Sequence, residues 1–272
     1  ISLCGTFFMA FNYVAQAGWS VSIKRVPEAM GGFLKYAMVG MIIIFILGHE
    51  YIYSWTHPEF YDPKSPEYDH ILAGKSGFLN IPFFLIRLIA YSVIWVGFTY
   101  ILRRHSIMED QEGGLEHYKR SITLSAIFLV LFAVTSSTSA WDFLMSIDSH
   151  WFSTLFGWYT FIGLFVSGMA MMCLLILYLQ GRGYMQHVTE NHLHDVGKFM
   201  FAFSIFWTYL WFSQFMLIWY ANLPEEVVYF QVRWNFFRTL WVANLLINFC
   251  APFLVLMTRD AKRQRRILWI GG

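Results

Sequence analysis

The chain has 272 residues, of which 57% are hydrophobic, 20% are aromatic and only 13% are charged, with a formal net charge of +2. Soluble domains carry about 25% charged residues, so this composition excludes an ordinary soluble enzyme, and no nucleic-acid signature appears. We expect an all-α, polytopic transmembrane helical protein.

The apolar residues cluster into runs of about 20, the length that a membrane-spanning helix needs. A β-barrel would need alternating segments of about ten residues, which do not occur. Glycine and proline separate the runs, and we expect one integral membrane domain over 1–272 with the start of an eighth helix near Ile267. The seven full helices are expected at 1–16, 32–54, 79–103, 121–146, 151–179, 197–221 and 238–258.

The chain starts at Ile1 inside one apolar run and stops at Gly272 as another begins. We therefore expect it to be the interior of a longer protein, in which no signal peptide can be judged. Cys4, Cys173 and Cys250 lie far apart, and no CxxC or CxxCH motif occurs. This disfavours iron–sulfur ligation and c-type haem attachment within the chain.

Cationic residues between the expected helices indicate an orientation, because cytoplasmic loops carry an excess of Lys and Arg. The second, fourth and sixth gaps hold only Lys64, Lys75, Arg233 and Arg238. The other gaps hold Lys24, Arg25, Arg103, Arg104, Lys119, Arg120, Arg182, Arg259, Lys262, Arg263, Arg265 and Arg266. We therefore place the gaps 17–31, 104–120, 180–196 and 259–266 in the cytoplasm.

One expected helix carries a polar stripe within the stretch TSSTSAWD. Thr135, Thr138, Ser139 and Asp142 follow the i, i+3, i+4, i+7 rule and share one face. That face must point into the bundle or toward water, because lipid cannot satisfy it. In one interpretation the hydroxyls bond to their own or a neighbouring helix and allow close packing. In the other, Asp142 with its stripe has a proton-relay or quinol-side role, and Asp148 lies at the outer surface.

The expected helix at 197–221 offers a second polar surface, formed by Tyr209, Ser213 and Gln214. We expect these residues to hold a water chain or to contact a neighbouring helix. The alternative interpretation is an interfacial aromatic belt with one interhelical hydrogen bond. In the helix at 79–103, Arg87 lies too deep for easy exposure. It either snorkels outward or forms a buried ion pair, for which Glu50 is the nearest carboxylate in depth.

The histidines lie at expected helix ends or in loops, which disfavours a b-type haem held between helices. His187, His192 and His194 share one cytoplasmic loop but have no second group of ligands nearby, so we expect no metal site. No P-loop, Rossmann glycine motif or Ser/His constellation occurs. We therefore assign no catalytic and no cofactor-binding residue.

Several stretches are long and unusual enough to be compared with a known family. They are AQAGWS followed by RVPEA, GKSGFLNIPFFLIR, SAWDFLMSIDSHWFSTLFGWY, HDVGKFMF and FWTYLWFSQFMLIWYANLPEE. From about Ala15 to Glu226 the chain resembles the ActF subunits of bacterial alternative complex III, described as quinol:cytochrome c oxidoreductase quinone-binding subunit 2. The resemblance implies an NrfD-like membrane subunit built from paired four-helix bundles.

The resemblance also implies a non-catalytic subunit in the bacterial inner membrane, assembled with subunits of the ActA, ActB, ActC, ActD and ActE types and with membrane lipid. Such a complex oxidises quinol or menaquinol near the periplasmic face. Electrons then pass through iron–sulfur clusters and c-type haems on other subunits to a soluble electron carrier or a terminal oxidase. The quinol pocket is attributed mainly to ActC, so the implied role here is a scaffold and proton path without a redox cofactor. The resemblance implies Asp142 as the proton acceptor or relay and Asp148 as the exit-side acid of that path.

Two other functions remain open. A secondary transporter or proton channel working alone should show broken helices in two matching halves, but the candidates Pro252, Gly163 and Gly168 do not pair. A pure scaffold would use the polar stripe for packing only. The long acidic gap 55–78 is expected to dock an extramembrane partner, the alternative being a solvated loop.

Overall fold

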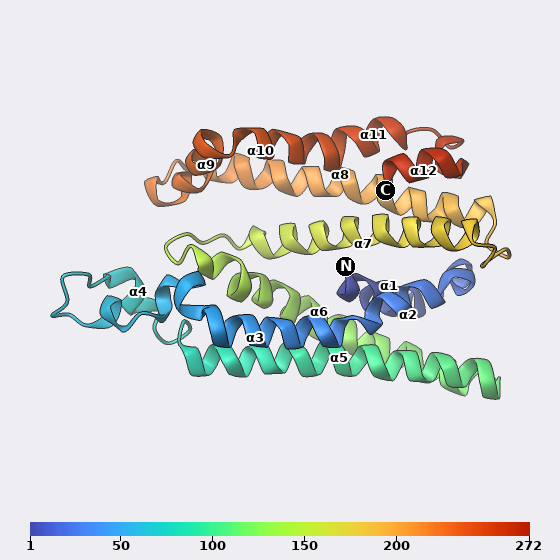
Figure 1. Cartoon of the computed structure of the whole chain (residues 1–272), viewed down its shortest axis with the longest axis horizontal. Coiled ribbons are helices and arrows are strands. Elements are labelled where there is room, and N and C mark those ends of the chain that lie inside the picture. The colour runs from blue at the N-terminus through green and yellow to red at the C-terminus, as the bar shows by residue number, and fades with distance from the viewer.

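The computed structural model describes residues 1–272, which form helices and no β-strand. Six helical segments are long and apolar enough to cross a membrane, and they run along the long axis of the molecule (Figure 1). They are Arg25–Ile52, Ile81–Glu112, Glu116–Ile147, Leu155–Gly181, Glu190–Ala221 and Arg238–Val255. The expectation of an all-helical, multi-pass membrane protein is confirmed at this level.

The α-helices follow one another with short connections, apart from the longer segment that contains α4. Their bounds are α1 (Ser2–Val14), α2 (Arg25–Gly32), α3 (Leu34–Ile52), α4 (His70–Lys75), α5 (Ile81–Glu112), α6 (Glu116–Phe143), α7 (Leu155–Gly181), α8 (Glu190–Ala221), α9 (Pro224–Phe236), α10 (Arg238–Leu245), α11 (Ala251–Val255) and α12 (Arg265–Gly271).

Several helices extend into residues that the hydropathy pattern assigns to loops. The gap expected at 17–31 contains α2, which continues into α3 as one span, and most of the gap expected at 104–120 belongs to α5 and α6. The reason is that hydropathy measures only the apolar part of a helix, whereas polar residues continue the same hydrogen-bond ladder beyond it. Conversely, the expected span at 1–16 is a helix of only 13 residues.

The last expected span is not a regular helix. Between α10 and α11 the backbone forms a π-helical turn at Leu246–Cys250, directly before Pro252. Proline has no backbone N–H and disturbs the preceding turn of an α-helix, and π-turns are one way to absorb such a disturbance. This span is therefore interrupted near its middle.

Local sequence signals explain where the longest helices begin and end. The Asn80 side chain accepts a hydrogen bond from the backbone N–H of Phe83 at 2.9 Å, and Pro82 occupies the first turn of α5. Both features favour a helix start. Gly113, which follows α5, has a φ of +69°, and Asn222, which follows α8, lies in the left-handed region, as is common at helix C-termini.

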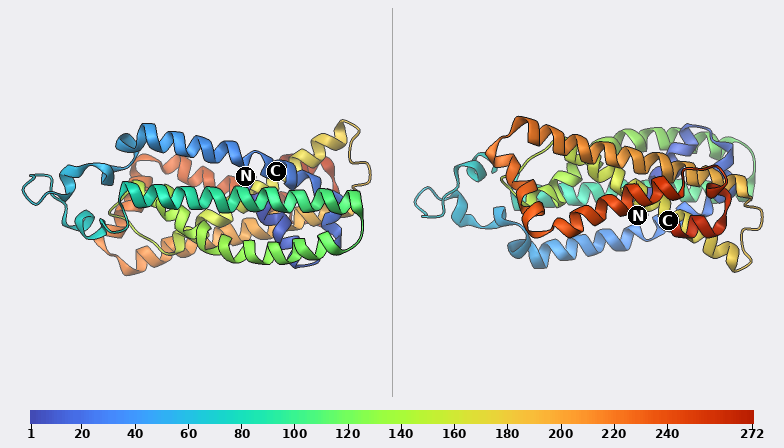
Figure 2. Two further views of the ribbon diagram at one scale, coloured as in Figure 1. Left: turned by 90° about the horizontal axis from the view of Figure 1, so that it is seen from below. Right: turned by 90° about the horizontal axis from the view of Figure 1, so that it is seen from above.

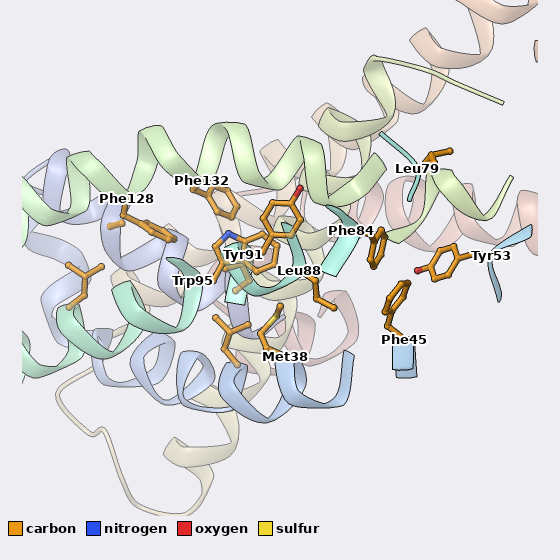
Figure 3. Close-up of a cluster of buried hydrophobic side chains, with 14 of the residues drawn as sticks. Met38, Phe45, Tyr53, Leu79, Phe84, Leu88, Tyr91, Trp95, Phe128 and Phe132 are labelled. Atoms are coloured by element: carbon orange, nitrogen blue, oxygen red, sulfur yellow. The ribbon is translucent and has the colours of Figure 1, made fainter. Parts of the chain in front are cut away.

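The core divides into two large clusters of buried apolar residues. The first lies between α1, α3, α5 and α6 and is rich in aromatic rings (Figure 3). The second lies between α1, α2, α7, α8 and α12. Helix α1 contributes to both clusters, so it joins the two parts of the molecule. The views from above and below show the longer helices running along the same axis (Figure 2).

The connections gather at the two ends of the bundle (Figure 1). One end, here called the α4 end, holds 53–80, 144–154 and 222–237. The opposite end holds 15–24, 113–115, 182–189 and 256–264, and is here called the basic end because most of the clustered Lys and Arg residues lie at or near it. The polar residue of greatest interest, Asp142, lies near the α4 end.

Candidate functional site: a buried ion pair between two membrane helices

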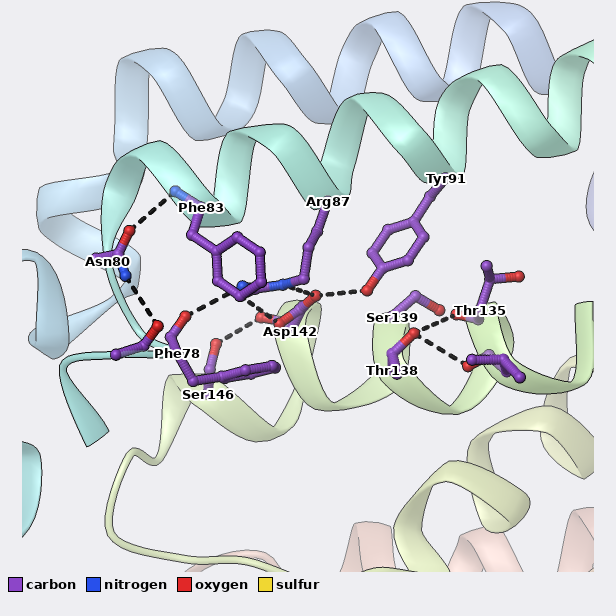
Figure 4. A network of polar contacts seen from close by, with 12 residues as sticks. Phe78, Asn80, Phe83, Arg87, Tyr91, Thr135, Thr138, Ser139, Asp142 and Ser146 are labelled. Carbon is purple, nitrogen blue, oxygen red and sulfur yellow. Dashed lines mark hydrogen bonds and ion pairs between the residues drawn. The ribbon is translucent and has the colours of Figure 1, made fainter. Parts of the chain in front are cut away.

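Asp142, in the last turn of α6, forms an ion pair with Arg87 of α5 (Figure 4). The Nε atom of Arg87 donates to Oδ2 at 2.8 Å, and Nη2 donates to Oδ1 at 2.8 Å. Only 1% of the Asp142 side chain and 11% of the Arg87 side chain are exposed. Two parallel charge-assisted hydrogen bonds of this length are the strongest arrangement available to an arginine and a carboxylate.

The guanidinium of Arg87 is held from other directions as well. Its Nη1 atom donates to the backbone carbonyl of Phe78 at 3.1 Å. The rings of Phe78 and Phe83 lie 4.0 and 4.3 Å from its Cζ atom. Aromatic faces at this distance stabilise a cation, so Arg87 is fixed in place by the turn that precedes α5 and by the first turn of α5 itself.

The carboxylate of Asp142 has a third hydrogen-bond donor. The hydroxyl of Tyr91 donates to Oδ2 at 2.7 Å, and the hydroxyl of Ser146 donates to the Asp142 backbone carbonyl at 2.5 Å. Tyr91 stacks on Trp95, whose indole N–H donates to Thr135 Oγ1 at 2.9 Å. A buried charge is tolerated when it is paired and hydrogen-bonded, and Asp142 meets both conditions.

The expected pairing of Arg87 with Glu50 is wrong. Glu50 lies at the end of α3 with an exposed side chain, whereas Arg87 lies on the side of α5 that packs against α6. The pairing was predicted because the two residues have a similar depth along the bundle axis. Depth does not determine the direction in which a helix face points.

The hydroxyls of the polar stripe bond mainly to their own helix. Thr135, Thr138 and Ser139 each donate to a backbone carbonyl three or four residues earlier, at 2.8, 3.0 and 2.9 Å. Next to them, a Cβ atom added at Gly157 of α7 would lie 3.0 Å from the Cα atom of Ser137. The small residues thus let α6 and α7 approach closely, as the packing interpretation expects.

The second predicted polar surface does not join Asp142. Helix α8 packs mainly against α7, and no hydrogen bond links Tyr209, Ser213 or Gln214 to the ion pair. The Tyr209 side chain is 62% exposed, and the side-chain nitrogen of buried Gln214 has no partner. This surface and the polar stripe with Asp142 therefore belong to different helix pairs.

An open cavity of about 360 Å³ lies at the α4 end, between the turn that joins α4 to α5 and the α6–α7 connection. Asp148, the predicted exit-side acid, lines it with an exposed side chain. Phe78 and Ser146 also line it, and these are residues whose backbone carbonyl or hydroxyl contacts Arg87 or Asp142. One layer of residues thus separates the ion pair from this cavity.

A second polar cluster, at the basic end, was missed by the sequence analysis. Glu28 of α2 is 3% exposed and accepts hydrogen bonds from Arg25 Nη1 and Ser106 Oγ, both at 2.5 Å. Asp110 pairs with Arg25 and with Lys24, the latter at 2.6 Å. The i, i+3 spacing of Arg25 and Glu28 is a helical signal, but the assignment of 17–31 to a loop concealed it.

The histidines before and at the start of α8 make local structural contacts. A ring nitrogen of His187 lies 2.9 Å from the backbone carbonyl of Ser22. His192 and Thr189 form a capping box at the N-terminus of α8. In the whole chain, no group of three or more His, Cys, Asp or Glu side chains is placed to hold a metal ion.

A scan against protein-family models finds no match, and a search of curated proteins finds no relative. The function must therefore be argued from the residues and their geometry.

Proposed function

We propose that the chain is an ActF-like membrane subunit of a quinol-oxidising complex in the bacterial inner membrane, built from paired four-helix bundles. The observation that carries the proposal is the ion pair between Arg87 and Asp142, with Tyr91 as third partner, inside helices long enough to cross a membrane. Ionisable residues within membrane helices are costly, so they mark functional sites by default.

In this proposal the ion pair is the proton-linked element of the subunit. Asp142 already accepts three hydrogen bonds, so it takes up a proton only when its contact with Arg87 opens. Arg87 stays in place during this opening, because the Phe78 carbonyl and two aromatic rings hold it independently of the carboxylate. A proton released from Asp142 has the nearby cavity with Asp148 as its exit.

The redox chemistry belongs to partner subunits in this proposal. Quinol or menaquinol oxidation, the iron–sulfur clusters and the c-type haems lie outside the chain, and the final acceptor is a soluble carrier or a terminal oxidase. The α4 end faces the periplasm, as the cationic residues at the basic end support. The segment 53–80 at the α4 end then docks an extramembrane subunit.

A purely structural scaffold is the second candidate, and one observation favours it. The stripe hydroxyls bond to their own helix, and all the Asp142 contacts are satisfied within the chain. In that case the ion pair only fixes α5 against α6. The two candidates predict different turnover for a variant in which both Asp142 and Arg87 are replaced by neutral residues.

The deciding experiment compares Asp142→Asn with the double variant Asp142→Asn/Arg87→Gln in the assembled complex. Subunit content is checked by gel, and quinol:cytochrome c turnover is measured. The double variant leaves no unpaired buried charge, so it separates charge imbalance from proton transfer. If it assembles normally but turnover stays lost, the proton-linked role is supported. Full turnover in the assembled double variant would contradict the proton-linked role and support the purely structural scaffold.

A further inference from the structure

The segment 53–80, here called the α4 segment, contacts the residues on both sides of the buried ion pair. On the side of Arg87, the carbonyl of Phe78 accepts a hydrogen bond from Nη1, and the Phe78 ring centroid lies 4.0 Å from the guanidinium Cζ atom (Figure 4). On the other side, the Tyr53 hydroxyl donates to the backbone carbonyl of Phe143 at 3.2 Å, and this residue directly follows the aspartate. The α4 segment therefore holds both sides of the pair, although neither charged partner belongs to it.

Lys75, in the last turn of α4, connects these two sides. Its backbone carbonyl accepts a hydrogen bond from the N–H of Phe78 at 2.9 Å, and its ammonium donates to the backbone carbonyl of Ser149, in the α6–α7 connection, at 2.6 Å. Hydrogen bonds from a charged donor are stronger than those between neutral groups. One residue thus joins the turn that holds Arg87 to the connection that follows Asp142.

Two further contacts bind the α4 segment to the same connection. A ring nitrogen of His150 lies 2.5 Å from a carboxylate oxygen of Asp69, and the hydroxyl oxygens of Ser54 and Ser149 lie 3.2 Å apart. The segment itself is anchored in the first core cluster by buried apolar residues, which are Trp55, Leu72 and Leu79. It therefore forms a fixed support against which the connection is held.

The Asp142 side of the pair is less regular than the Arg87 side. Helix α6 ends at Phe143, one residue after Asp142, and is followed by a 3₁₀ turn at Met145–Ile147. The cavity of about 360 Å³ lies beside this turn and gives it room to shift. Arg87, by contrast, lies within the regular part of α5. Opening of the pair is therefore expected to move the carboxylate and to leave the guanidinium in place.

We propose that Lys75 is a positioning residue for Asp142. While the Lys75 ammonium holds the Ser149 carbonyl, the end of α6 stays against Arg87 and the carboxylate stays ionised. When this contact is released, the last turn of α6 shifts toward the cavity, and a carboxylate oxygen of Asp142 takes up a proton from the solvent. In the proposed function the α4 segment also docks an extramembrane subunit, so that subunit controls the proton step through Lys75. This control, unlike the positioning itself, rests on the proposed function.

The first test is infrared difference spectroscopy of the purified protein in nanodiscs at neutral pH, which detects the carbonyl stretch of a protonated carboxylic acid. The wild type should show no such band from Asp142. Lys75→Met should produce a band that disappears when Asp142→Asn is added, because a buried carboxylate that has lost its cation favours the neutral form. Lys75→Arg keeps a charged donor and should restore the wild-type spectrum. Lys64→Met, at an exposed lysine of the same segment, is the matched control and should also match the wild type.

Backbone hydrogen exchange of the same proteins measures the movement directly. Residues 142–148 should exchange about tenfold faster in Lys75→Met, the effect expected for one charge-assisted hydrogen bond, while 84–88 in α5 keep their protection. Tyr53→Phe removes one neutral hydrogen bond and keeps the ring, so it should accelerate exchange at 142–148 by about two- to tenfold. This milder variant keeps the proposal testable if Lys75→Met does not fold. Unchanged exchange at 142–148, or an equal acceleration in α5, would overturn the positioning role.

Quinol:cytochrome c turnover in the assembled complex separates this inference from the proposed function. If Lys75→Met shows the infrared band and the faster exchange but keeps full turnover, Lys75 positions Asp142 and the proton-linked role of the pair is wrong. If the spectrum and the exchange stay as in the wild type, the positioning role is wrong, whatever the turnover.

Discussion

Asp142 and Arg87 are held together by two hydrogen bonds of 2.8 Å across the interface of α5 and α6. The pair is nearly enclosed, and Tyr91 and Phe78 complete its hydrogen bonds. Replacing one partner of such a pair is expected to destabilise the protein more than replacing both. The reason is that the remaining residue is then a buried charge without compensation.

The first prediction follows from this asymmetry. Asp142→Ala and Arg87→Met should each lower the free energy of unfolding by about 3–5 kcal/mol. The double variant should lower the free energy of unfolding by clearly less than the sum of the two single effects. Tyr91→Phe should lower it by only about 1.5–3 kcal/mol. Unfolding in mixed detergent micelles measures these differences. Strictly additive single effects would show that the two residues do not depend on each other.

The sequence alone predicted that Asp142 is a key residue, because hydroxyls and a carboxylate at helical spacing within an apolar segment leave few alternatives. It did not predict the partner. Arg87 and Glu50 were compared by depth, whereas the contact depends on which faces of α5 and α6 meet. That information lies in helix packing, which a single sequence does not contain.

The same limit explains the two other differences. Gln214 was expected to hold a water chain or to contact a neighbouring helix, but its side-chain nitrogen is buried without a partner, and α8 packs mainly against α7. The buried Glu28 was missed because hydropathy assigned its segment to a loop, although Arg25–Ile52 forms one continuous span. The all-helical class and six of the seven expected spans follow from apolar run length, a local property, whereas the seventh, expected at 1–16, is a helix of only 13 residues. The polar contacts between helices do not.

The second prediction concerns close packing around α7. A Cβ atom at Gly168 would lie 2.3 Å from the Cβ atom of Cys4, whereas one at Gly163 would have its nearest neighbour 3.7 Å away, in Trp207. Gly168→Ala should therefore destabilise the protein by about 1–3 kcal/mol through overpacking. Gly163→Ala is the control on the same helix and should be tolerated. Thermal unfolding of both variants checks the order, and equal midpoints would contradict it.

The third prediction tests the cluster at the basic end. Glu28→Gln removes the charge that Arg25 contacts and weakens the short hydrogen bond from Ser106. Because the Arg25 side chain is 44% exposed, its part of the loss is screened by solvent, and we expect a total loss of about 1–3 kcal/mol in the free energy of unfolding. Glu109→Gln is the matched control, since its nearest cation, Lys24, is 4.0 Å away. A larger effect in the control would show that the cluster is not centred on Glu28.

Asp69, at the α4 end, combines a helix cap with an ion pair. Its carboxylate accepts hydrogen bonds from the backbone N–H groups of Ile71 and Leu72 at 2.9 and 3.1 Å, and it lies 2.5 Å from a ring nitrogen of His150. Burial acts to raise the pKa of Asp69, but the amides and the histidine together lower it below its usual value. The ionised form is therefore the one that the folded segment prefers.

The fourth prediction is a pH dependence of this segment. Because the folded-state pKa of Asp69 is lowered, its contribution to stability is fully present above the usual aspartate value of about 3.9 and is lost as the pH falls through the lower folded value. Hydrogen exchange of 55–78, corrected for the intrinsic rate, should therefore be faster below about pH 4 than at about pH 5. Asp69→Asn keeps an N-cap side chain but cannot ionise, so it should flatten this profile. An unchanged profile in the variant would assign the pH dependence to another group.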